Sequence, residues 1–194
     1  MAIEPVIDPA RTAVLSMDMQ TAIVSIYAGD QDAFTARAAG VLRECRERKI
    51  TTIHVQVGFR PGLPEVSPRN ALFAAVKKSP EHRKLFQGDT GKIHPAVAPV
   101  GEDIVITKHR ISAFTGTDLD MILRANAIDT LVLFGIATSG VVLSTLLDAV
   151  DADYRAIVIT DCCADRDAEL HKVLVEKFFP HRGTAMTATE FLES

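Results

Sequence analysis

Three short stretches of the sequence contain the residue types that move protons or hold an anion. Asp18 and Lys108 each stand at the end of an apolar run, and residues 135–142 lead from the apolar run 130–134 through a glycine turn into a helical pattern. The first backbone N–H groups of such a helix have no partner within it, so they can hold an anion or an oxyanion. An acid, a lysine and this helix N-terminus together would allow proton transfer beside a stabilised oxyanion.

Each of these residues also has an ordinary structural explanation. Asp18 could serve as a turn or cap residue, and Lys108 could be a solvated charge at a strand end. Arg60, His109 and Arg110 could be surface charges, but their grouping at one edge of a sheet would suit an anionic ligand such as a carboxylate. The chemistry therefore depends on whether the fold brings these side chains together.

The remaining histidine and thiol candidates favour packing over chemistry. His54 lies within the β-branched run 50–57 and has no histidine or acid at metal-ligand spacing, so we expect a hydrogen-bonded core histidine. Cys162 and Cys163 are adjacent at a strand end, where neighbouring residues face opposite ways, so at most one could face a site. We expect both cysteines to pack in the core.

Apolar runs and amphipathic patterns predict the elements that must position these residues. Uniformly apolar or β-branched runs predict strands at 12–17, 50–57, 103–107, 130–134, 155–160 and about 184–188. Helical spacing predicts helices at 31–48, 117–126, 138–150 and about 166–178, with Thr117 as the N-cap of the second. Apolar strands that alternate with helices indicate a parallel sheet covered on both faces.

A parallel sheet would place the carboxyl ends of all its strands at one edge. Asp18, Phe59, Arg60, Lys108 and the glycine turn would then surround one crevice. The long connection after the second strand contains many of the prolines and glycines. A connection of this length inside a compact domain usually covers a site.

The composition is that of an ordinary globular enzyme-sized chain. Its 194 residues, 47% hydrophobic and 24% charged, predict a single domain spanning 1–194. The net charge of −4 gives no reason to expect nucleic acid or a membrane surface as a partner, and no apolar run approaches ~18 residues. Three cysteines without metal-ligand spacing, and an N-terminus without signal-peptide features, predict a cytoplasmic protein.

Taken in order, these residues resemble the isochorismatase-like (cysteine hydrolase) superfamily over nearly the whole chain, from Val14 to Met186. The resemblance is carried by Met17-Asp18-Met19-Gln20, by Val105-Ile106-Thr107-Lys108, and by Gly135-Ile136-Ala137-Thr138 followed by Thr145 and Asp148-Ala149. The family includes nicotinamidases, N-carbamoylsarcosine and ureido amidohydrolases, and isochorismatases. The resemblance implies an α/β fold of three α/β/α layers with a Rossmann-like parallel sheet of about six strands, and assembly as a homodimer or homotetramer.

The resemblance also implies a site. In the family's amidases an Asp–Lys–Cys triad hydrolyses a C–N bond through a thioester, beside an oxyanion turn shaped by a cis peptide. Asp18 and Lys108 match the first two members, Val141 stands where the amidases have the cysteine, and the oxyanion turn corresponds to Ile136, Ala137 and Val141, with the cis bond between Ile136 and Ala137. The implied substrate-binding residues are Gln20, Phe59, Arg60, His109, Arg110, Phe114 and Ser139.

The valine at the nucleophile position favours one branch of the family's chemistry. Val141 has neither a nucleophile nor a proton, so the thioester route is closed there. Some isochorismatases resemble this arrangement: they lack the cysteine, and a protonated Asp delivers a proton to a vinyl ether before water attacks. The nicotinamidase metal motif is absent, so we expect no metal and no other cofactor in the site. The expected partner is a small-molecule substrate.

Three functional hypotheses follow. The first is a hydrolase that uses Asp18 and Lys108 for acid–base chemistry on a small, carboxylate-bearing molecule by vinyl-ether-type cleavage. The second is a ligand-binding or regulatory homologue in which catalysis is impaired. The third is an amidohydrolase with its nucleophile relocated to Ser139, Ser112 or Cys163.

Overall fold

The computed structural model describes residues 7–194, and its centre is a sheet of six strands in which all neighbouring strands run parallel. The strands are β1 (Thr12–Met17), β2 (Thr51–Val57), β3 (Ile104–Lys108), β4 (Thr130–Ile136), β5 (Arg155–Ala164) and β6 (Thr184–Met186), in the order β3-β2-β1-β4-β5-β6. All residues of β1 and β4 are buried, which explains why their sequences are apolar throughout.

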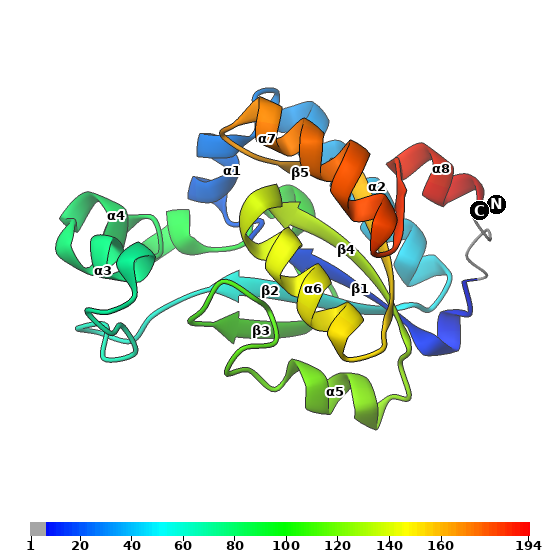
Figure 1. Ribbon diagram of the computed structural model, residues 1–194, viewed down its shortest axis with the longest axis horizontal. Helices are drawn as coiled ribbons and strands as arrows, with labels where there is room; N and C mark the ends of the chain where they lie inside the picture. Colours follow the sequence, from blue (N-terminus) through cyan, green and yellow to red (C-terminus); the bar gives the residue numbers. More distant parts are fainter. Residues whose placement is uncertain (1–6) are drawn as a thin grey trace.

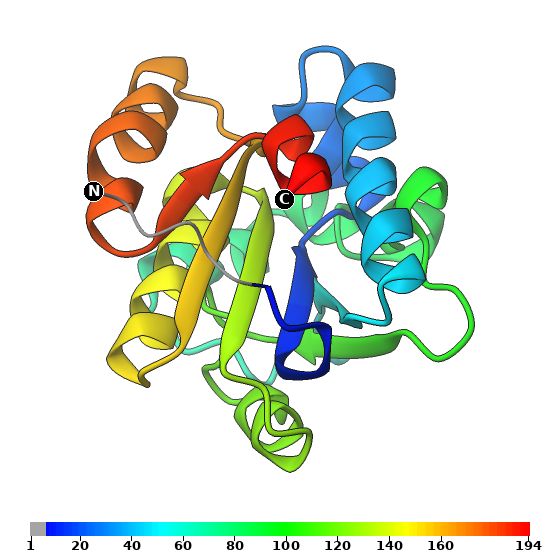
Figure 2. The same cartoon turned by 90° about the vertical axis from the view of Figure 1, so that its right-hand side faces the viewer.

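Helices cover both faces of this sheet. They are α1 (Thr21–Tyr27), α2 (Gln31–Glu47), α3 (Ala71–Lys78), α4 (Pro80–Lys84), α5 (Leu119–Ala125), α6 (Leu143–Asp151), α7 (Ala168–Val173) and α8 (Ala188–Glu193). Helices α2 and α8 lie on one face, and α6 and α7 lie on the other (Figure 2). The predicted three-layer α/β/α fold is therefore confirmed.

Several element boundaries differ from the prediction. Four short helices, α1, α3, α4 and α8, were not predicted, and β5 runs to Ala164 rather than to residue 160. The predicted helix 138–150 begins as a π-helical turn, η4 (Thr138–Val142), before α6. Thr117 is not the N-cap of α5; that residue is Asp118, and the Thr117 hydroxyl accepts a hydrogen bond from the backbone of Leu119 instead.

The strand register brings the expected carboxyl ends to one edge. Met17, the last residue of β1, pairs with Val55 on one side and with Gly135 on the other, and Val57 pairs with Lys108. The residues that follow β1, β2, β3 and β4 therefore lie at the same edge of the sheet.

The segment between β2 and β3 carries α3 and α4 out to the side of the sheet (Figure 1). We call residues 71–92 the lobe. Its inner side chains pack on Phe59, which lies two residues beyond the end of β2. Within residues 7–194 there is no helix with the length and apolar character needed to cross a bilayer.

Candidate active site

The acid and the lysine meet at this edge although their strands are not neighbours. Asp18 follows β1 and Lys108 ends β3, with β2 between them. Two strand spacings amount to ~9.5 Å, which only a long side chain can bridge. The Lys108 side chain spans this gap, and its Nζ lies 2.8 Å from Oδ2 of Asp18.

This ion pair is almost entirely removed from water. The exposed fraction is 6% for Asp18 and 2% for Lys108. The Lys108 Nζ also donates to the carbonyl of Arg110 at 3.0 Å, and the backbone N–H of Asp18 donates to the carbonyl of Val55 at 2.7 Å. The second carboxylate oxygen, Oδ1 of Asp18, is buried and has no hydrogen-bond partner among residues 7–194.

Burial and the lysine act in opposite directions on Asp18. Burial raises the pKa of Asp18, and the Lys108 ammonium lowers that pKa by a smaller amount, so the pKa lies above its ordinary value. Although an ammonium lies within hydrogen-bond distance, the net shift of the Asp18 pKa is toward the protonated form. A raised pKa suits a group that has to give a proton.

The glycine turn begins directly beside Asp18. At Gly135 the φ angle is +143°, and an added Cβ would lie 2.0 Å from the Met17 carbonyl oxygen, so this position requires glycine. The peptide bond between Ile136 and Ala137 is cis, as the resemblance implied. Val141 follows in the π-helical turn, with an exposed fraction of 2%.

The start of that turn is braced by β5 and α7. Asp165, which follows β5, accepts hydrogen bonds from both the backbone N–H and the hydroxyl of Ser139, each at 2.7 Å. The hydroxyl of Thr138 is 2.8 Å from Nδ1 of His171. Ser139, which was predicted to bind substrate, therefore donates its hydrogen bonds to a carboxylate of the protein itself. Sequence reasoning missed Asp165 and His171; Asp165 directly follows β5, whose predicted end was residue 160.

Gln20 has a structural role at the same edge. Its side-chain oxygen accepts from the backbone N–H of Val57 at 2.9 Å, and its side-chain nitrogen donates to the carbonyls of Val57 and Gly91, at 3.0 and 2.6 Å. With both N–H donors used, Gln20 ties the end of β2 to the lobe, and it has no donor left for a substrate.

The two arginines expected to bind a carboxylate are both engaged elsewhere. Arg60 forms an ion pair with Glu65, and its side chain is 69% exposed. Arg110 donates to the carbonyls of His109 and Glu65, at 2.6 and 3.1 Å. Sequence reasoning missed Glu65, because a carboxylate inside an irregular connection carries no periodic signal.

His109 is held in one orientation. Its Nδ1 lies 2.6 Å from the carbonyl of Gly58, and a carbonyl can only accept, so Nδ1 donates. His109 directly follows Lys108, and its ring lies 6.1 Å from the ring of Phe59. His109 therefore follows Lys108 in the sequence and lies beside Phe59, on which the lobe packs.

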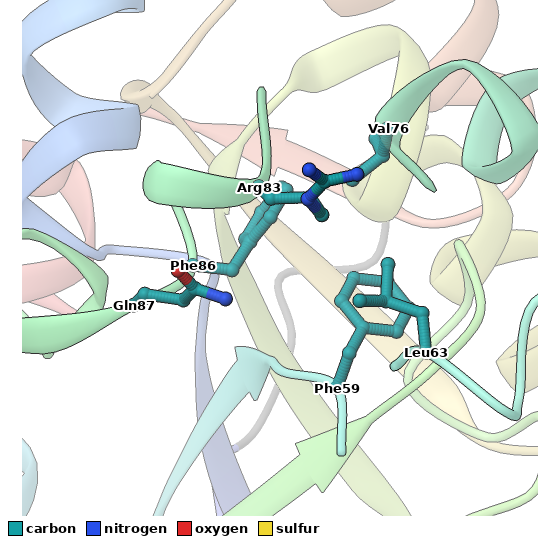
Figure 3. A pocket seen from close by; sticks show the side chains of 6 residues that line it. All are labelled: Phe59, Leu63, Val76, Arg83, Phe86 and Gln87. Atoms are coloured by element: carbon teal, nitrogen blue, oxygen red, sulfur yellow. The ribbon is translucent and has the colours of Figure 1, made fainter. Parts of the chain in front are cut away.

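Phe59 and Phe114, both predicted to contact substrate, lie in different places. Phe59 lines a small pocket together with Leu63, Val76, Arg83, Phe86 and Gln87 (Figure 3). Phe114 stacks instead on Tyr154, with ring centroids 6.0 Å apart, and Tyr154 precedes the first residue of β5. Tyr154 lies at the opposite end of the sheet from Asp18, so this contact does not place Phe114 beside the ion pair, and its contact with substrate stays a prediction.

The alternative nucleophiles are also in structural use. The hydroxyl of Ser112 donates to Asp148, and the thiol of Cys163 donates to the carbonyl of Ile159 at 3.3 Å. Burial raises the pKa of Cys163 to about 12, so its thiol stays protonated and unreactive at neutral pH. The hydroxyls of Ser112 and Ser139 each donate to a carboxylate, and a nucleophile relocated to one of them stays a prediction.

Two further observations limit what the site contains. In the part of the chain that the structure describes, no three histidine, cysteine or acidic side chains are grouped so that they could hold a metal ion. A larger open groove of about 380 Å³ lies elsewhere, lined by Asn70, Arg110, Ile111, Ser112, Thr115, Ser144, Leu147 and Asp148. That groove does not include Asp18, Lys108 or Val141.

Comparisons of the sequence and of the structure with known proteins identify relatives of this chain. The sequence model of the isochorismatase domain matches residues 12–190. The uncharacterized isochorismatase family protein YwoC of Bacillus subtilis is 34% identical over 187 residues, which cover 96% of this chain and 95% of that protein. Maleamate amidohydrolase of Pseudomonas putida is 30% identical over 148 residues, covering 76% and 67%. An isochorismatase family protein from Burkholderia thailandensis has a similar structure, with a TM-score of 0.81 at 28% identity and coverage of 98% and 99%.

Proposed function

Because the chain belongs to the isochorismatase family of hydrolases, we propose that it uses Asp18 and Lys108 for acid–base chemistry on a small, carboxylate-bearing molecule. The observation that carries the proposal is the buried ion pair itself, with one Asp18 oxygen on Lys108 and the other without a partner among the described residues. The proposed reaction is cleavage of a vinyl ether rather than thioester chemistry, because Val141 offers no nucleophile. It needs no cofactor.

The proposed mechanism begins with Asp18 protonated. Since Oδ2 accepts from Lys108, the proton sits on Oδ1, and its transfer to the terminal alkene carbon leaves an oxocarbenium ion. Water then adds at the ether carbon, and the hemiketal breaks its C–O bond to give a carbonyl compound and an alcohol. The proton lost from water returns to Asp18, so one water is consumed. Lys108 stabilises the carboxylate that exists between these two proton transfers.

A second candidate function rests on how closed the site is. Asp18, Lys108 and Val141 are almost inaccessible, and the Ser139 N–H already has Asp165 as its acceptor. These features favour a ligand-binding or regulatory homologue with impaired catalysis. The relative named maleamate amidohydrolase gives no support for amidase activity in this chain, because the thiol position is valine.

Turnover of isochorismate by the wild type and by Asp18→Asn tests the leading proposal. We expect the wild type to release a ketoacid, and Asp18→Asn to lose roughly 100-fold to 10,000-fold in rate, the usual contribution of a general acid. Asp151→Asn, the same change at an exposed site at the end of α6, is the matched control and should be unaffected.

The outcomes separate the two candidates. Equal turnover by wild type and Asp18→Asn, with both variants folded, would remove the assigned role of Asp18. A wild type that shows a thermal shift with small carboxylates but no turnover of vinyl ethers, amides or ureides would support the ligand-binding alternative.

A further inference from the structure

The pocket in Figure 3 lies where the lobe meets the end of β2. Arg83 and Phe86 lie on one side of it, and Phe59 and Leu63 face them from the other. The enclosed space is only about 10 Å³, roughly the room for one water-sized group. The pocket is therefore too small to enclose a carboxylate, and a ligand would rest at its mouth against Arg83 and the aromatic rings.

Its walls combine two aromatic rings, Phe59 and Phe86, with the polar side chains of Arg83 and Gln87. The Phe59 ring makes edge contacts with Phe73 and Phe86, at centroid distances of 5.5 and 5.6 Å. This aromatic cluster fixes the rings, so little side-chain freedom is lost when a ligand binds. Phe59 also lies beside His109, with ring centroids 6.1 Å apart, and His109 follows Lys108 in the sequence. The flat rings favour a planar group over a saturated chain.

Arg83 is the cation of this pocket. One of its terminal nitrogens donates to the carbonyl of Lys77, and within residues 7–194 no acidic side chain forms an ion pair with it. Arg60 and Arg110, by contrast, are bound to Glu65, one by its carboxylate and the other by its carbonyl. A guanidinium has five N–H donors in a planar fork that matches a carboxylate, and Arg83 gives up only one of them to the protein.

The charge around this pocket also favours an anion. The lobe, residues 71–92, contains five lysines or arginines and two acids, a net charge of +3, whereas the whole chain carries −4. A local positive field of this kind attracts an anionic ligand toward the site despite the overall negative charge.

We propose that Arg83, with the rings of Phe59 and Phe86, forms the subsite that receives the carboxylate of a short, planar, unsaturated substrate. This assignment rests on the proposed function for the identity of the reaction, but it concerns binding alone. The carboxylate pairs with the free side of the Arg83 guanidinium, and the unsaturated chain lies against Phe59 and leads toward His109 and the ion pair.

Titration by two-dimensional ¹H–¹⁵N NMR with crotonate, crotonamide and butyrate tests the subsite. Crotonate and crotonamide share size and planarity but differ in charge, and butyrate keeps the charge but loses the planarity. We expect crotonate to bind at least tenfold more tightly than crotonamide, to shift the Arg83 Nε–H resonance, and to bind more tightly than butyrate.

Two variants with the same change of charge localise the effect. Arg83→Gln should lose at least tenfold in crotonate affinity and should no longer distinguish crotonate from crotonamide. Lys84→Gln, the adjacent and exposed position on α4, should keep both properties. Phe59→Leu should lose the preference for crotonate over butyrate while keeping the preference for charge.

Equal crotonate affinities for Arg83→Gln and Lys84→Gln would overturn the subsite, as would equal binding of crotonate and crotonamide by the wild type. Both variants lie on an exposed helix, and thermal melts confirm that they are folded. Because the titration requires no turnover, a failure of the vinyl-ether assay leaves this result interpretable. Conversely, a failed titration leaves the assay of Asp18→Asn intact.

Discussion

The chemistry depends on the Asp18–Lys108 ion pair, and the burial of this pair raises the pKa of Asp18. Breaking a buried ion pair by removing one partner typically costs ~3–5 kcal/mol, because the other charge stays unpaired in the interior. Asp18 can avoid much of this cost by taking up a proton, since burial already raises its pKa. Besides its ion pair with Asp18, the Lys108 ammonium donates a hydrogen bond to the Arg110 carbonyl.

The pH dependence of the reaction follows from these two influences on Asp18. If Asp18 acts while protonated, the rate falls as the pH rises through its pKa. Lys108→Met removes the ammonium that lowers this pKa, so the pKa rises further and the loss of activity moves to higher pH. The maximal rate should also fall, because the carboxylate formed during the reaction loses its counter-ion.

A pH–rate profile of the wild type and Lys108→Met measures this shift, with Lys84→Met as the surface control. A profile of Lys108→Met in which activity is lost at lower pH than in the wild type would contradict the assignment. A rate that instead rises with pH, with that rise moved to higher pH in Lys108→Met, would make the ionised form of Asp18 the active one.

The second residue-scale prediction concerns Val141. Val141→Cys should place a thiol on the first turn after β4, where a helix N-terminus and a nearby ammonium usually lower a thiol's pKa. Incubation with iodoacetamide followed by mass spectrometry should give one adduct. The three native thiols give a silent background, because burial raises the pKa of Cys45 and Cys163 to about 12 and also raises that of Cys162.

Val142→Cys, at the fully buried neighbouring position, is the matched control and should not react. Labelling of Val142→Cys in place of Val141→Cys would show that the nucleophile position has been assigned to the wrong residue. A gain of amide hydrolysis in Val141→Cys alone would show that the rest of the amidase geometry is intact.

The sequence could predict those site residues whose position follows from the end of a strand. Asp18 and Lys108 could be predicted because each stands at the carboxyl end of a strand, and these ends share an edge of the sheet. The engagement of Arg110 could not, because its acceptor Glu65 lies 45 positions away in an irregular connection. Arg83 was missed for the same reason: its segment shows no period that would place it beside Phe59.

At the scale of elements, the contact between β1 and β4 sets the geometry of the site. Gly135 pairs with Met17, the residue directly before Asp18. Any side chain at position 135 would meet the β1 backbone. Gly135→Ala should therefore force the two strands apart, lowering the free energy of unfolding by at least about 3 kcal/mol and abolishing activity.

Urea denaturation of purified protein measures this effect, and Gly140→Ala provides a nearby comparison. At Gly140 an added Cβ would meet only Ala137, at an ordinary contact distance of 3.7 Å. That substitution should change stability by less than about 1 kcal/mol. Similar midpoints for the two variants would show that the close approach at Gly135 does not govern the β1–β4 contact.

The elements that the sequence predicted are those with a long, regular pattern. All six strands were expected because apolar runs without caps are a strong signal for a buried parallel sheet. The short helices were missed because one or two turns give too little periodicity. Helix α8 is instructive, since Thr187 and Glu190 form a capping box that marks its start although its pattern does not. Helix α1 has no side-chain cap.

At the scale of the whole molecule, the site lies where the sheet changes its direction of winding. In the order β3-β2-β1-β4-β5-β6, chain connections proceed outward from β1 on one side and from β4 on the other. Ligands of open α/β sheets bind at the carboxyl ends of the strands at this switch point. Asp18 follows β1 and the glycine turn ends β4, so both flank the switch point, and the lobe approaches it from the β2 side (Figure 1).

The lobe consists of short helices, whereas β1 and β4 are fully buried in the sheet, and this difference predicts which part of the molecule opens more readily. Amide hydrogens of residues 71–92 should exchange at least about tenfold faster than those of β1 and β4, because short exposed helices open at a lower free energy than a buried sheet. Hydrogen exchange read by mass spectrometry resolves these segments.

Crotonate should slow exchange in the lobe of the wild type but not of Arg83→Gln, since the guanidinium would hold the ligand against the lobe. Exchange in the lobe as slow as in β1 would instead show that lobe and sheet open as one unit, and that a substrate reaches Asp18 without the lobe moving.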